Sequence, residues 1–354
     1  MAQPGSTPAA GGFTLPADWS PHERCWMAWP CREALWKGRI AEARAAYAEL
    51  AKVIAAYEPV TMIAREAHVV DASIMCGAGV EVMPLAIDDS WIRDTGPAFL
   101  TGPDGGLAGV AGVAGVAGVD WGFNGWGGKH TPYADDAATA EKVLARLGIP
   151  RYAAPVVLEG GAYICDGEGT IIVTEQCALN ENRNPGLTRE VMTQTLKDYL
   201  GVHEVIWLAG GLEHDETEGH VDNVARFAAP GVVLAVSPGE PGDDSFDVLT
   251  ENLARLSAAG DARGRRLEVR ELPRPAPRLS GGRVYVQSYA NFYVANGAVI
   301  APSFEDSNDA KAREVIARAF PKRRFEQVPA ADISFGGGGI HCATLEQPAA
   351  GAVG

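Results

Sequence analysis

The sequence predicts an α/β fold of about five repeated ββαβ units, and three observations support that prediction. One order of elements (strand, turn, strand, loop, helix, strand) recurs along the chain although the residues themselves diverge. Tight DG, PG and NG turns fall inside these units, between two apolar runs. No Pro/Ser-rich linker separates the units, so we expect a single domain with a closed or nearly closed arrangement.

The clearest unit covers residues 161–209. Its first part, GAYICDGEGTIIVTEQ, holds two apolar runs separated by a DG turn, which is typical of a hairpin. After the polar loop CALNENRNPG, apolar residues recur at helical spacing in LTREVMTQTLKDYL, and Thr188 is placed to cap that helix. HEVIWLA then follows as a further strand.

The same order is found in the rest of the chain. It recurs as NVARFAAPGVVLAVS, DVLTENLARLSAA and LEVREL, and again as VYVQSYANFYVANGAVIAPSF, DAKAREVIARAF and RFEQV. Upstream, PAFL and a valine-rich segment lead to the helix DDAATAEKVLARLG and the strand APVVLE. The first unit is less complete, with CWMAWP, a long helix around GRIAEARAAYAELAKVIAAY, and VTMIA. A doubly wound sheet is the alternative, but such a sheet joins its strands through helices rather than tight hairpins.

Two segments lie outside this pattern. The N-terminus has neither the basic region nor the apolar region of a signal peptide, so we expect a disordered leader at residues 1–18 and one domain over residues 19–350. The three-residue repeat GVAGVAGVAGVD at residues 109–120 suits neither a strand nor a helix. We expect it to be an expanded hairpin connection.

The composition excludes several classes of partner. Apolar residues make up 47% of the 354 residues and charged residues 21%, as in a globular protein with a core. A net charge of -15 argues against nucleic acid, because phosphate binding needs clustered Lys and Arg; attraction of a cationic substrate and simple solubility both fit it. No apolar run is long enough to span a membrane. Six cysteines without a CxxC pair indicate reduced thiols and a cytoplasmic location.

Four polar stretches gather beside tryptophans and glycines in a way that an ordinary surface would not. They are DDSWIRDTGP (88–97), LEGG (158–161), HDETEGHVDN (214–223) and GGGGIHC (336–342). The first three lie at or just before the start of a unit, and equivalent positions in a ring of units converge near its axis. The fourth follows the last unit and can reach the same centre.

Cys342 is the candidate nucleophile. It follows four glycines, which allow close backbone approach, and a cysteine beside a positive group forms a strongly nucleophilic thiolate. A single cysteine is more often a buried apolar thiol, but the glycine run and the adjacent His341 favour catalysis. His220 and Asp222 form an H-x-D pair whose side chains would share one face of an extended segment. Because such a pair can also bind zinc, a zinc hydrolase with Cys342 as a third ligand stays open.

The carboxylates indicate the kind of substrate. Asp94, Asp222 and Glu159 supply several negative charges, and His220 is the one obvious cation, so the site needs a positive charge from its ligand. A guanidinium is planar, stays protonated and presents paired N–H donors to carboxylates. The bound cation would also lower the pKa of Cys342. Taken singly, Asp94 could be a local turn cap and Glu159 a strand-end carboxylate.

These residues resemble the agmatine deiminase family, within the guanidine-modifying superfamily that also contains arginine deiminases and protein-arginine deiminases. The resemblance runs from about Trp19 to Pro348 and is carried by WIRDTGP, WGFNGWGG, LEGG, NENRNPG, ETEGHVDN and GGGGIHC. It implies a five-bladed α/β propeller, the pentein fold, for the catalytic domain. It also implies hydrolysis of agmatine to N-carbamoylputrescine and ammonia in putrescine (polyamine) biosynthesis, without a metal or cofactor. We expect the protein to form a homo-oligomer, a dimer.

The resemblance gives each candidate residue a role. Cys342 is the nucleophile that forms a covalent amidino-thioether, His220 is the acid/base, and Glu159 orients His220. Asp94 and Asp222 bind the guanidinium. The residues assigned to the rest of the substrate are Trp91, Glu216 and Thr217. An acidic Glu216 suits a free amine and repels an α-carboxylate, which favours agmatine over arginine, although a solvated acidic turn also explains it.

The chain departs from the family pattern at Gly339, where a polar residue is common, in the tail ATLEQP, and in the valine–glycine expansion. The last two departures could alter the rim of the site and the choice of substrate. A peptidyl-arginine deiminase, or a deiminase of another guanidine compound, is therefore the alternative activity. A catalytically silent binding protein on the same fold is the alternative outside enzymes, but all four core groups are retained.

Overall fold

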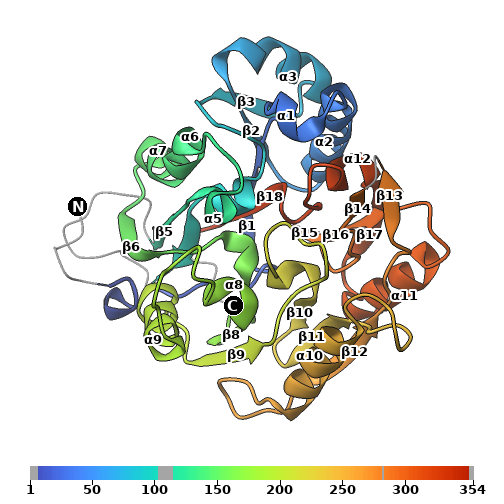
Figure 1. Ribbon diagram of the computed structural model, residues 1–354. Helices are drawn as coiled ribbons and strands as arrows, with labels where there is room; N and C mark the ends of the chain where they lie inside the picture. The colour runs from blue at the N-terminus through green and yellow to red at the C-terminus, as the bar shows by residue number, and fades with distance from the viewer. Residues whose placement is uncertain (1–6, 103–114, 281–282, 351–354) are drawn as a thin grey trace.

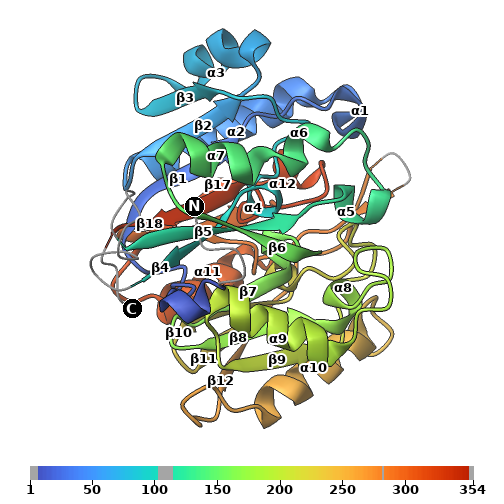
Figure 2. The ribbon, with the colours of Figure 1, turned by 90° about the vertical axis from the view of Figure 1, so that its left-hand side faces the viewer.

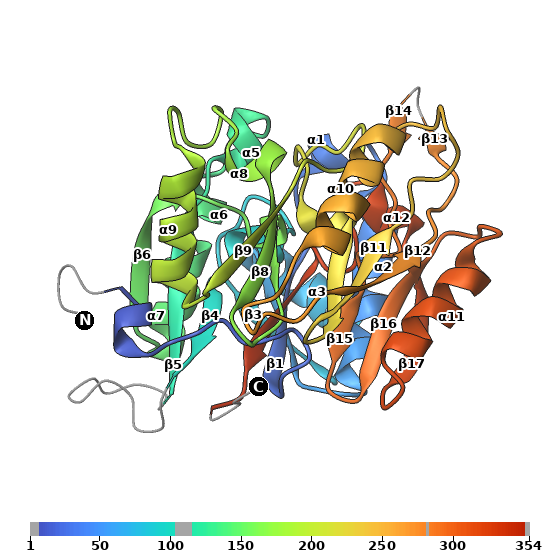
Figure 3. The same ribbon diagram turned by 90° about the horizontal axis from the view of Figure 1, so that it is seen from below.

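The computed structural model describes residues 7–102, 115–280 and 283–350. The strands and helices follow one another around a common centre (Figure 1). Figure 3 shows three of the helices, α9, α10 and α11, on the outside of the strands. No helix among the described residues combines the length and the apolar character needed to cross a bilayer.

In the described part of the chain, five sheets of three or four strands share one pairing pattern, in which the first pair is antiparallel and the next is parallel. In strand order these sheets are β18 (Thr344–Pro348), β1 (His22–Ala28), β2 (Val60–Ala64) and β3 (Val80–Pro84); β4 (Ala98–Thr101), β5 (Val116–Gly122) and β6 (Arg151–Val157); β7 (Tyr163–Cys165), β8 (Thr170–Thr174) and β9 (Glu204–Leu208); β10 (Ala225–Ala229), β11 (Val232–Val236) and β12 (Glu268–Leu272); and β15 (Tyr293–Ala295), β16 (Ala298–Ser303) and β17 (Arg324–Pro329). A separate hairpin pairs β13 (Arg278–Ser280) with β14 (Arg283–Tyr285).

A helix connects the two parallel strands of each unit, because a parallel pair needs a crossover. These helices are α2 (Ile40–Ala55), α7 (Thr139–Leu147), α9 (Arg189–Leu200), α10 (Phe246–Ala258) and α11 (Asp309–Ala319), and α3 (Val69–Cys76) leads from β2 to β3. The short helices are η1 (Ala9–Gly11), α1 (Glu33–Trp36), η2 (Glu66–His68), α4 (Ile92–Thr95), α5 (Gly125–Gly128), α6 (Ala134–Ala137), η3 (Gly160–Ala162), α8 (Glu175–Ala178), η4 (Val221–Asn223) and α12 (Ala331–Ser334).

The α/β class and the repeated order of elements are confirmed. The PG and NG pairs form the tight turns before β11 and β16, where Gly231 and Gly297 have φ values of 76° and 85°. Thr188 caps α9 by accepting a hydrogen bond from the backbone N–H of Val191 at 3.3 Å. Because the hairpins divide the strands into separate sheets, the doubly wound alternative is wrong.

The first unit is completed from the far end of the chain. β18 pairs antiparallel with β1, with Met27 opposite Thr344 and Trp26 opposite Leu345. This strand supplies the antiparallel neighbour that the sequence left missing, and its pairing brings Cys342 beside the N-terminal unit.

The prediction of a disordered leader is wrong for residues 7–18, and residues 1–6 lie outside the described residues. Thr14 forms a β-bridge with Thr101, and the backbone N–H of Leu15 donates to the carbonyl of Leu200. Phe13 is 2% exposed and packs against the ring of Tyr152. Figure 2 shows η1 beside α9. Burial of the apolar side chains in FTLPA offsets the entropy lost on ordering this segment. A single domain over residues 19–350 stays a prediction.

The expected loop in the valine–glycine repeat is wrong for residues 116–120, which belong to β5, whereas residues 103–114 lie outside the described residues. β5 pairs with β4 on one side and β6 on the other, so backbone hydrogen bonds compensate for its poor strand periodicity. Gly118 also fits its place, because an added Cβ would overlap the side chain of Leu144 in α7.

Candidate active site

The segments that precede the first strand of each unit meet at the centre of the molecule. Asp94 lies in α4, before β4, and Glu159 lies next to η3, before β7. His220 and Asp222 lie at η4, before β10, and Cys342 lies two residues before β18. Contacts of α4 with η3, of η3 with η4, and of α4 with β18 join these segments. The four polar stretches therefore converge as the sequence predicts.

Cys342 is a buried thiol between two polar side chains. It is 2% exposed, and its Sγ donates to Asp222 Oδ2 at 3.4 Å and accepts from Asn291 Nδ2 at 3.2 Å. Burial and the nearby Asp222 and Asp94 carboxylates raise the pKa of Cys342 well above its ordinary range. This setting therefore favours the neutral thiol.

The glycine run before Cys342 lets the backbone pack tightly against four side chains. A Cβ at Gly337, where φ is 100°, would lie 2.9 Å from Glu216 Oε2. A Cβ at each of the other three glycines would overlap a neighbouring side chain, namely Trp36 at Gly336, Trp91 at Gly338 and Asn291 at Gly339. The polar residue that the family often has in place of Gly339 would therefore require Asn291 to shift.

His220 and Asp222 converge, but not as an extended segment. His220 (φ -54°, ψ 132°) precedes the 3₁₀ turn η4, which contains Asp222, so the prediction of a shared strand face is wrong. Their side chains meet over Gly161, where an added Cβ would lie 2.5 Å from His220 Nδ1 and 3.1 Å from Asp222 Oδ2. The same Cβ would lie 3.1 Å from Asp94 Oδ1, so LEGG needs glycine here to admit all three groups.

The carboxylates around His220 favour its protonated form. Its ring is fully buried, with Nδ1 3.8 Å from Asp94 Oδ1 and Nε2 3.8 Å from Glu159 Oε2. Burial lowers the pKa of His220, but the Asp94 carboxylate, Cys177 and Glu159 together raise that pKa well above its ordinary value. Neither ring nitrogen has a hydrogen-bond partner within the described residues, and Nε2 faces Glu159.

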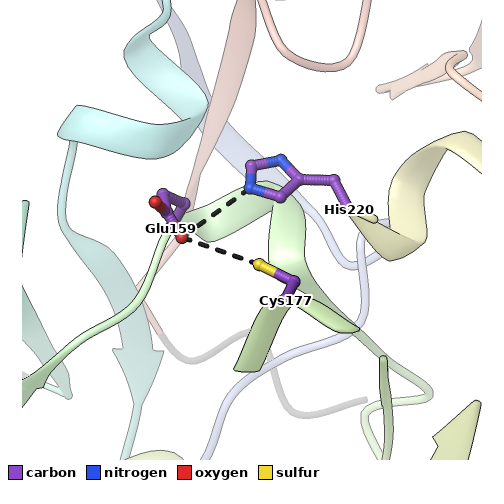
Figure 4. Close-up of side chains that lie close together, drawn as sticks. All are labelled: Glu159, Cys177 and His220. Carbon is purple, nitrogen blue, oxygen red and sulfur yellow. Dashed lines mark hydrogen bonds and ion pairs between the residues drawn. The ribbon is translucent and has the colours of Figure 1, made fainter. Parts of the chain in front are cut away.

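Glu159 joins His220 to a cation that the sequence analysis missed. Its Oε2 faces both His220 and the Cys177 thiol, each at 3.8 Å (Figure 4), and its Oε1 accepts from Arg183 Nε at 2.9 Å. Burial raises the pKa of Glu159, but His220 and Arg183 outweigh it and hold that pKa at about 2. His220 is thus not the one cation near the site. Arg183 lies in the NENRNPG motif, which gave the signal, but its pairing depends on how the loop folds.

Replacing Arg183 by methionine is expected to lower the free energy of unfolding by about 3–5 kcal/mol, because Glu159 would lose its partner in a buried site. Glu159 has a pKa depressed from 4.5 to about 2, so its contribution to stability is present above pH 4.5 and is lost as pH falls toward 2. Urea unfolding at pH 7.5 and across that window measures both effects. In Arg183→Met, the free energy of unfolding lost between pH 4.5 and about 2 should be smaller than in the wild type.

The control is Arg318→Met. Arg318 pairs with Glu314 on the exposed face of α11, and its side chain is 76% exposed. We expect a change below about 0.5 kcal/mol, as for other exposed ion pairs. Equal losses in the two variants would contradict a special role for the buried pair.

The two remaining carboxylates sit close to the thiol. Asp94 accepts hydrogen bonds from the Gly161 N–H at 2.9 Å and from Trp126 Nε1 at 3.0 Å. Asp222 Oδ2 lies 2.8 Å from His341 Nδ1, whereas its Oδ1 has no hydrogen-bond partner among the described residues. Burial raises the pKa of Asp94, and it raises the pKa of Asp222 to about 6. Two buried carboxylates with unused acceptor capacity have the chemistry that complements a cation.

A pocket that Cys342 lines also has the predicted binding residues Trp91, Glu216 and Thr217 in its walls. Trp91, 4% exposed, forms one wall and stacks on Trp36, with ring centroids 6.0 Å apart. The Thr217 hydroxyl donates to Asp215 and accepts from the His220 N–H, so it also fixes the loop that carries His220. The full lining is Arg32, Leu35, Trp91, Asp94, Trp126, His130, Glu216, Thr217, Gly336, Gly337, Gly338 and Cys342.

Asn291 is a site residue that the sequence analysis missed. Its Nδ2 donates to Cys342 Sγ, and its Oδ1 accepts from the backbone N–H of His341 at 2.8 Å and of Cys342 at 3.3 Å. Asn291 lies two residues before β15, the first strand of the fifth unit. A ring of about five units predicts a fifth inward segment at this place, and that signal was present.

The geometry disfavours the zinc alternative. Among the described residues, the group compact enough to hold a metal ion is Glu159, Cys177 and His220, with ligand atoms within 4.8 Å of one another, and not His220, Asp222 and Cys342. A zinc ion there would have to replace the proton that the neighbouring carboxylates favour on His220, and would approach Arg183, which already binds Glu159.

The chain is similar to known proteins in sequence and in fold. The sequence model of the Porphyromonas-type peptidyl-arginine deiminase family matches residues 14–348. The chain is 41% identical to the agmatine deiminase of Pseudomonas aeruginosa (strain LESB58) over 379 residues, which cover 99% of each chain. It is 40% identical to the agmatine deiminase of Stutzerimonas stutzeri, over 97% of this chain and 98% of the other. The solved structure of agmatine deiminase from Enterococcus faecalis superposes with a TM-score of 0.92 at 32% identity, covering 98% of both chains.

Proposed function

Because this chain belongs to the Porphyromonas-type peptidyl-arginine deiminase family, and agmatine deiminases match it over nearly its whole length, we propose that it hydrolyses agmatine to N-carbamoylputrescine and ammonia. One observation carries this proposal. The Cys342 thiol and the buried Asp94 carboxylate line a pocket that also includes Glu216, and a second buried carboxylate, Asp222, lies 3.4 Å from the thiol with one oxygen unpaired among the described residues. A molecule with a guanidinium at one end and an amine at the other complements that arrangement.

In the first half of the reaction, the guanidinium binds between Asp94 and Asp222, and its positive charge lowers the pKa of the Cys342 thiol. The thiol releases its proton to solvent, because His220 already carries one. The thiolate adds to the guanidinium carbon. His220, already protonated through its carboxylate neighbours, gives its proton to the departing ammonia. The product of this half is an amidino-thioether on Cys342.

In the second half, neutral His220 removes a proton from a water molecule, which attacks the amidino-thioether carbon. The C–S bond breaks, the ureido product leaves, and the thiolate re-forms. Glu159, anchored by Arg183, keeps a negative charge next to His220 during both transfers. General acid/base help of this kind contributes about 10²–10⁴-fold, and the carbon chain of the substrate extends along Trp91 and Thr217.

The amine end of agmatine is assigned to Glu216. Its Oε2 lies 3.8 Å from His130 Nε2, and its main-chain oxygen accepts from Lys129 Nζ, so the residue is held from the α5 side of the pocket. An ammonium adds a favourable charge contact with Glu216, whereas the α-carboxylate of arginine adds a repulsive one. The proposal therefore includes selectivity for agmatine over free arginine.

Glu216→Gln is expected to raise KM for agmatine about 10- to 100-fold with little change in kcat, because the lost contact lies away from the reacting carbon. The selectivity over arginine should shrink in the same variant. Assays of the ureido product with agmatine, arginine and a blocked arginyl peptide measure both effects.

The matched control is Glu213→Gln, an exposed acidic residue in the same loop, which should leave all three rates unchanged. If the wild type turned over the blocked peptide as well as agmatine, the peptidyl-arginine alternative would replace this proposal.

We also propose a fold and a cellular location for the enzyme. The five-fold repetition of one pairing pattern around a common centre supports a five-bladed α/β propeller. The six free cysteines support a reducing, cytoplasmic location. A homodimer and a place in putrescine biosynthesis stay predictions.

A further inference from the structure

We propose that His341 is a positioning residue that holds the Asp222 carboxylate in place for the guanidinium. This inference rests on the proposed function, since it concerns how that site keeps one of its two carboxylates oriented. His341 donates no group to the reacting atoms and acts through Asp222.

The contacts of His341 place its ring against one oxygen of Asp222. Nδ1 lies 2.8 Å from Asp222 Oδ2, and the ring is 2% exposed. The backbone is fixed on both sides, because the His341 N–H donates to Asn291 Oδ1 at 2.8 Å and the His341 carbonyl accepts from Arg93 Nε at 3.4 Å. The ring therefore has little freedom to follow a carboxylate that rotates.

The tautomer of the ring follows from its partner. An ionised carboxylate only accepts hydrogen bonds, so Nδ1 must carry the proton that points to Asp222. Nε2 has no hydrogen-bond partner among the described residues and lies 3.7 Å from Asp18 Oδ2. Asp18 is itself paired with Arg226 at 2.5 Å, so its charge is largely taken up by that guanidinium.

A neutral ring is what this role requires. Burial, together with Arg226, Arg93 and His220, lowers the pKa of His341 well below its ordinary value. A cationic ring would neutralise Asp222 and compete with the guanidinium. The neutral ring instead donates a hydrogen bond and leaves the full negative charge to the substrate, with Asp222 Oδ1 unpaired in the part of the chain that the structure describes.

The hydrogen bond also favours the ionised form of Asp222, whose pKa burial raises to about 6. A donor to the charged form lowers the pKa of a carboxyl, so loss of His341 should raise it further. The charged or titratable groups that face Asp222 are His341 and Cys342 from the C-terminal segment, Asp94 from α4, Arg226 from β10, and His220 and Asp215 from its own loop. A His341 variant keeps the other five groups. A shift of the acid limb of its pH–activity profile therefore reports the lost hydrogen bond.

The test compares two substitutions at one position. Asparagine can place an amide N–H near the position of Nδ1, whereas glutamine places its amide farther out, near Nε2. For His341→Gln we expect kcat/KM for agmatine to fall about 10- to 100-fold at pH 7, since a hydrogen bond to a charged group is lost. The acid limb of its pH profile should move up by about one unit. His341→Asn should stay within about threefold of the wild type and keep its pH profile.

The control is the same substitution at another buried histidine–carboxylate pair. His22 Nδ1 lies 3.1 Å from Glu58, and His22 also contacts the main-chain oxygen of Asp18. His22→Gln should lower the melting temperature but leave the acid limb where it is. The inference is overturned if His341→Gln keeps the wild-type limb, if His22→Gln shifts it equally, or if His341→Asn is as impaired as His341→Gln. A wild type without turnover of agmatine, arginine or peptide overturns the proposed function, and this inference with it.

Discussion

Replacing Cys342 by alanine is expected to abolish turnover of agmatine, with a fall in kcat of about 10⁴-fold or more, because the guanidinium carbon is too poor an electrophile to react without the thiolate. The carboxylates that hold the cation, Asp94 and Asp222, are untouched by this change. Binding of agmatine, measured by calorimetry, should therefore persist. Ammonia release and ureido product measure the loss of turnover.

The decisive companion experiment is mass spectrometry of wild-type enzyme quenched during agmatine turnover. An amidino adduct is expected on the peptide that carries Cys342 and on no other cysteine peptide. Cys76→Ala, at a buried free cysteine of α3, is the matched control and should keep full activity. An adduct on a different residue, or ammonia release by Cys342→Ala, would remove Cys342 from the mechanism. Unchanged binding in Cys342→Ala beside a wild type without turnover would instead indicate a binding protein.

The positive charge of a bound ligand should increase the reactivity of the Cys342 thiol. We expect the cationic reagent 2-chloroacetamidine to inactivate the enzyme at least about 100-fold faster at pH 7 than neutral 2-chloroacetamide, because each unit by which the thiol pKa falls multiplies the thiolate fraction about tenfold. Burial, Asp222 and Asp94 raise that pKa in the free enzyme, and a bound cation offsets the carboxylates. With the neutral reagent, the rate should keep rising with pH to well above pH 9, whereas the rate with the cationic reagent should level off at lower pH.

Two controls isolate the protein's contribution. The ratio of the two rates on glutathione gives the intrinsic reactivity of the reagents. In Asp222→Asn the ratio should shrink, and alkylation by the neutral reagent should become faster, because a carboxylate 3.4 Å from Sγ no longer opposes the thiolate. Equal ratios on the enzyme and on glutathione would show that substrate charge does not activate Cys342.

Much of this site could be predicted from the sequence, because its chemistry stands at repeated positions in the chain. Asp94, Glu159, Asp222 and Cys342 each lie within four residues of the first strand of a unit. A ring of repeated units turns that shared position into spatial proximity. Asn291 obeys the same rule, but it stands in the apolar run YANFYV, without the charged residues or glycine runs that marked the other four segments.

The missed features depend on contacts between residues far apart in the chain. Arg183 pairs with Glu159 only because the loop after β8 folds back over the start of β7. The H-x-D pattern did not show that η4 would form, since a turn and a strand both place such residues near each other. Thr14 and Leu15 appeared to belong to a leader because their hydrogen-bond partners, Thr101 and Leu200, lie far along the chain. The periodicity of a short stretch of sequence does not indicate contacts with residues far along the chain.

The pairing of β18 with β1 has a consequence for folding during synthesis on the ribosome. At about 5–20 residues per second, β1 emerges roughly a quarter of a minute to a minute before β18 is made. During that interval β1 has an open edge, which is a hazard for aggregation. Cys342 lies two residues before this late strand, so a nascent chain can bury much of its apolar surface before the nucleophile reaches the centre. During synthesis, ammonia release from agmatine should therefore begin only when β18 has paired with β1.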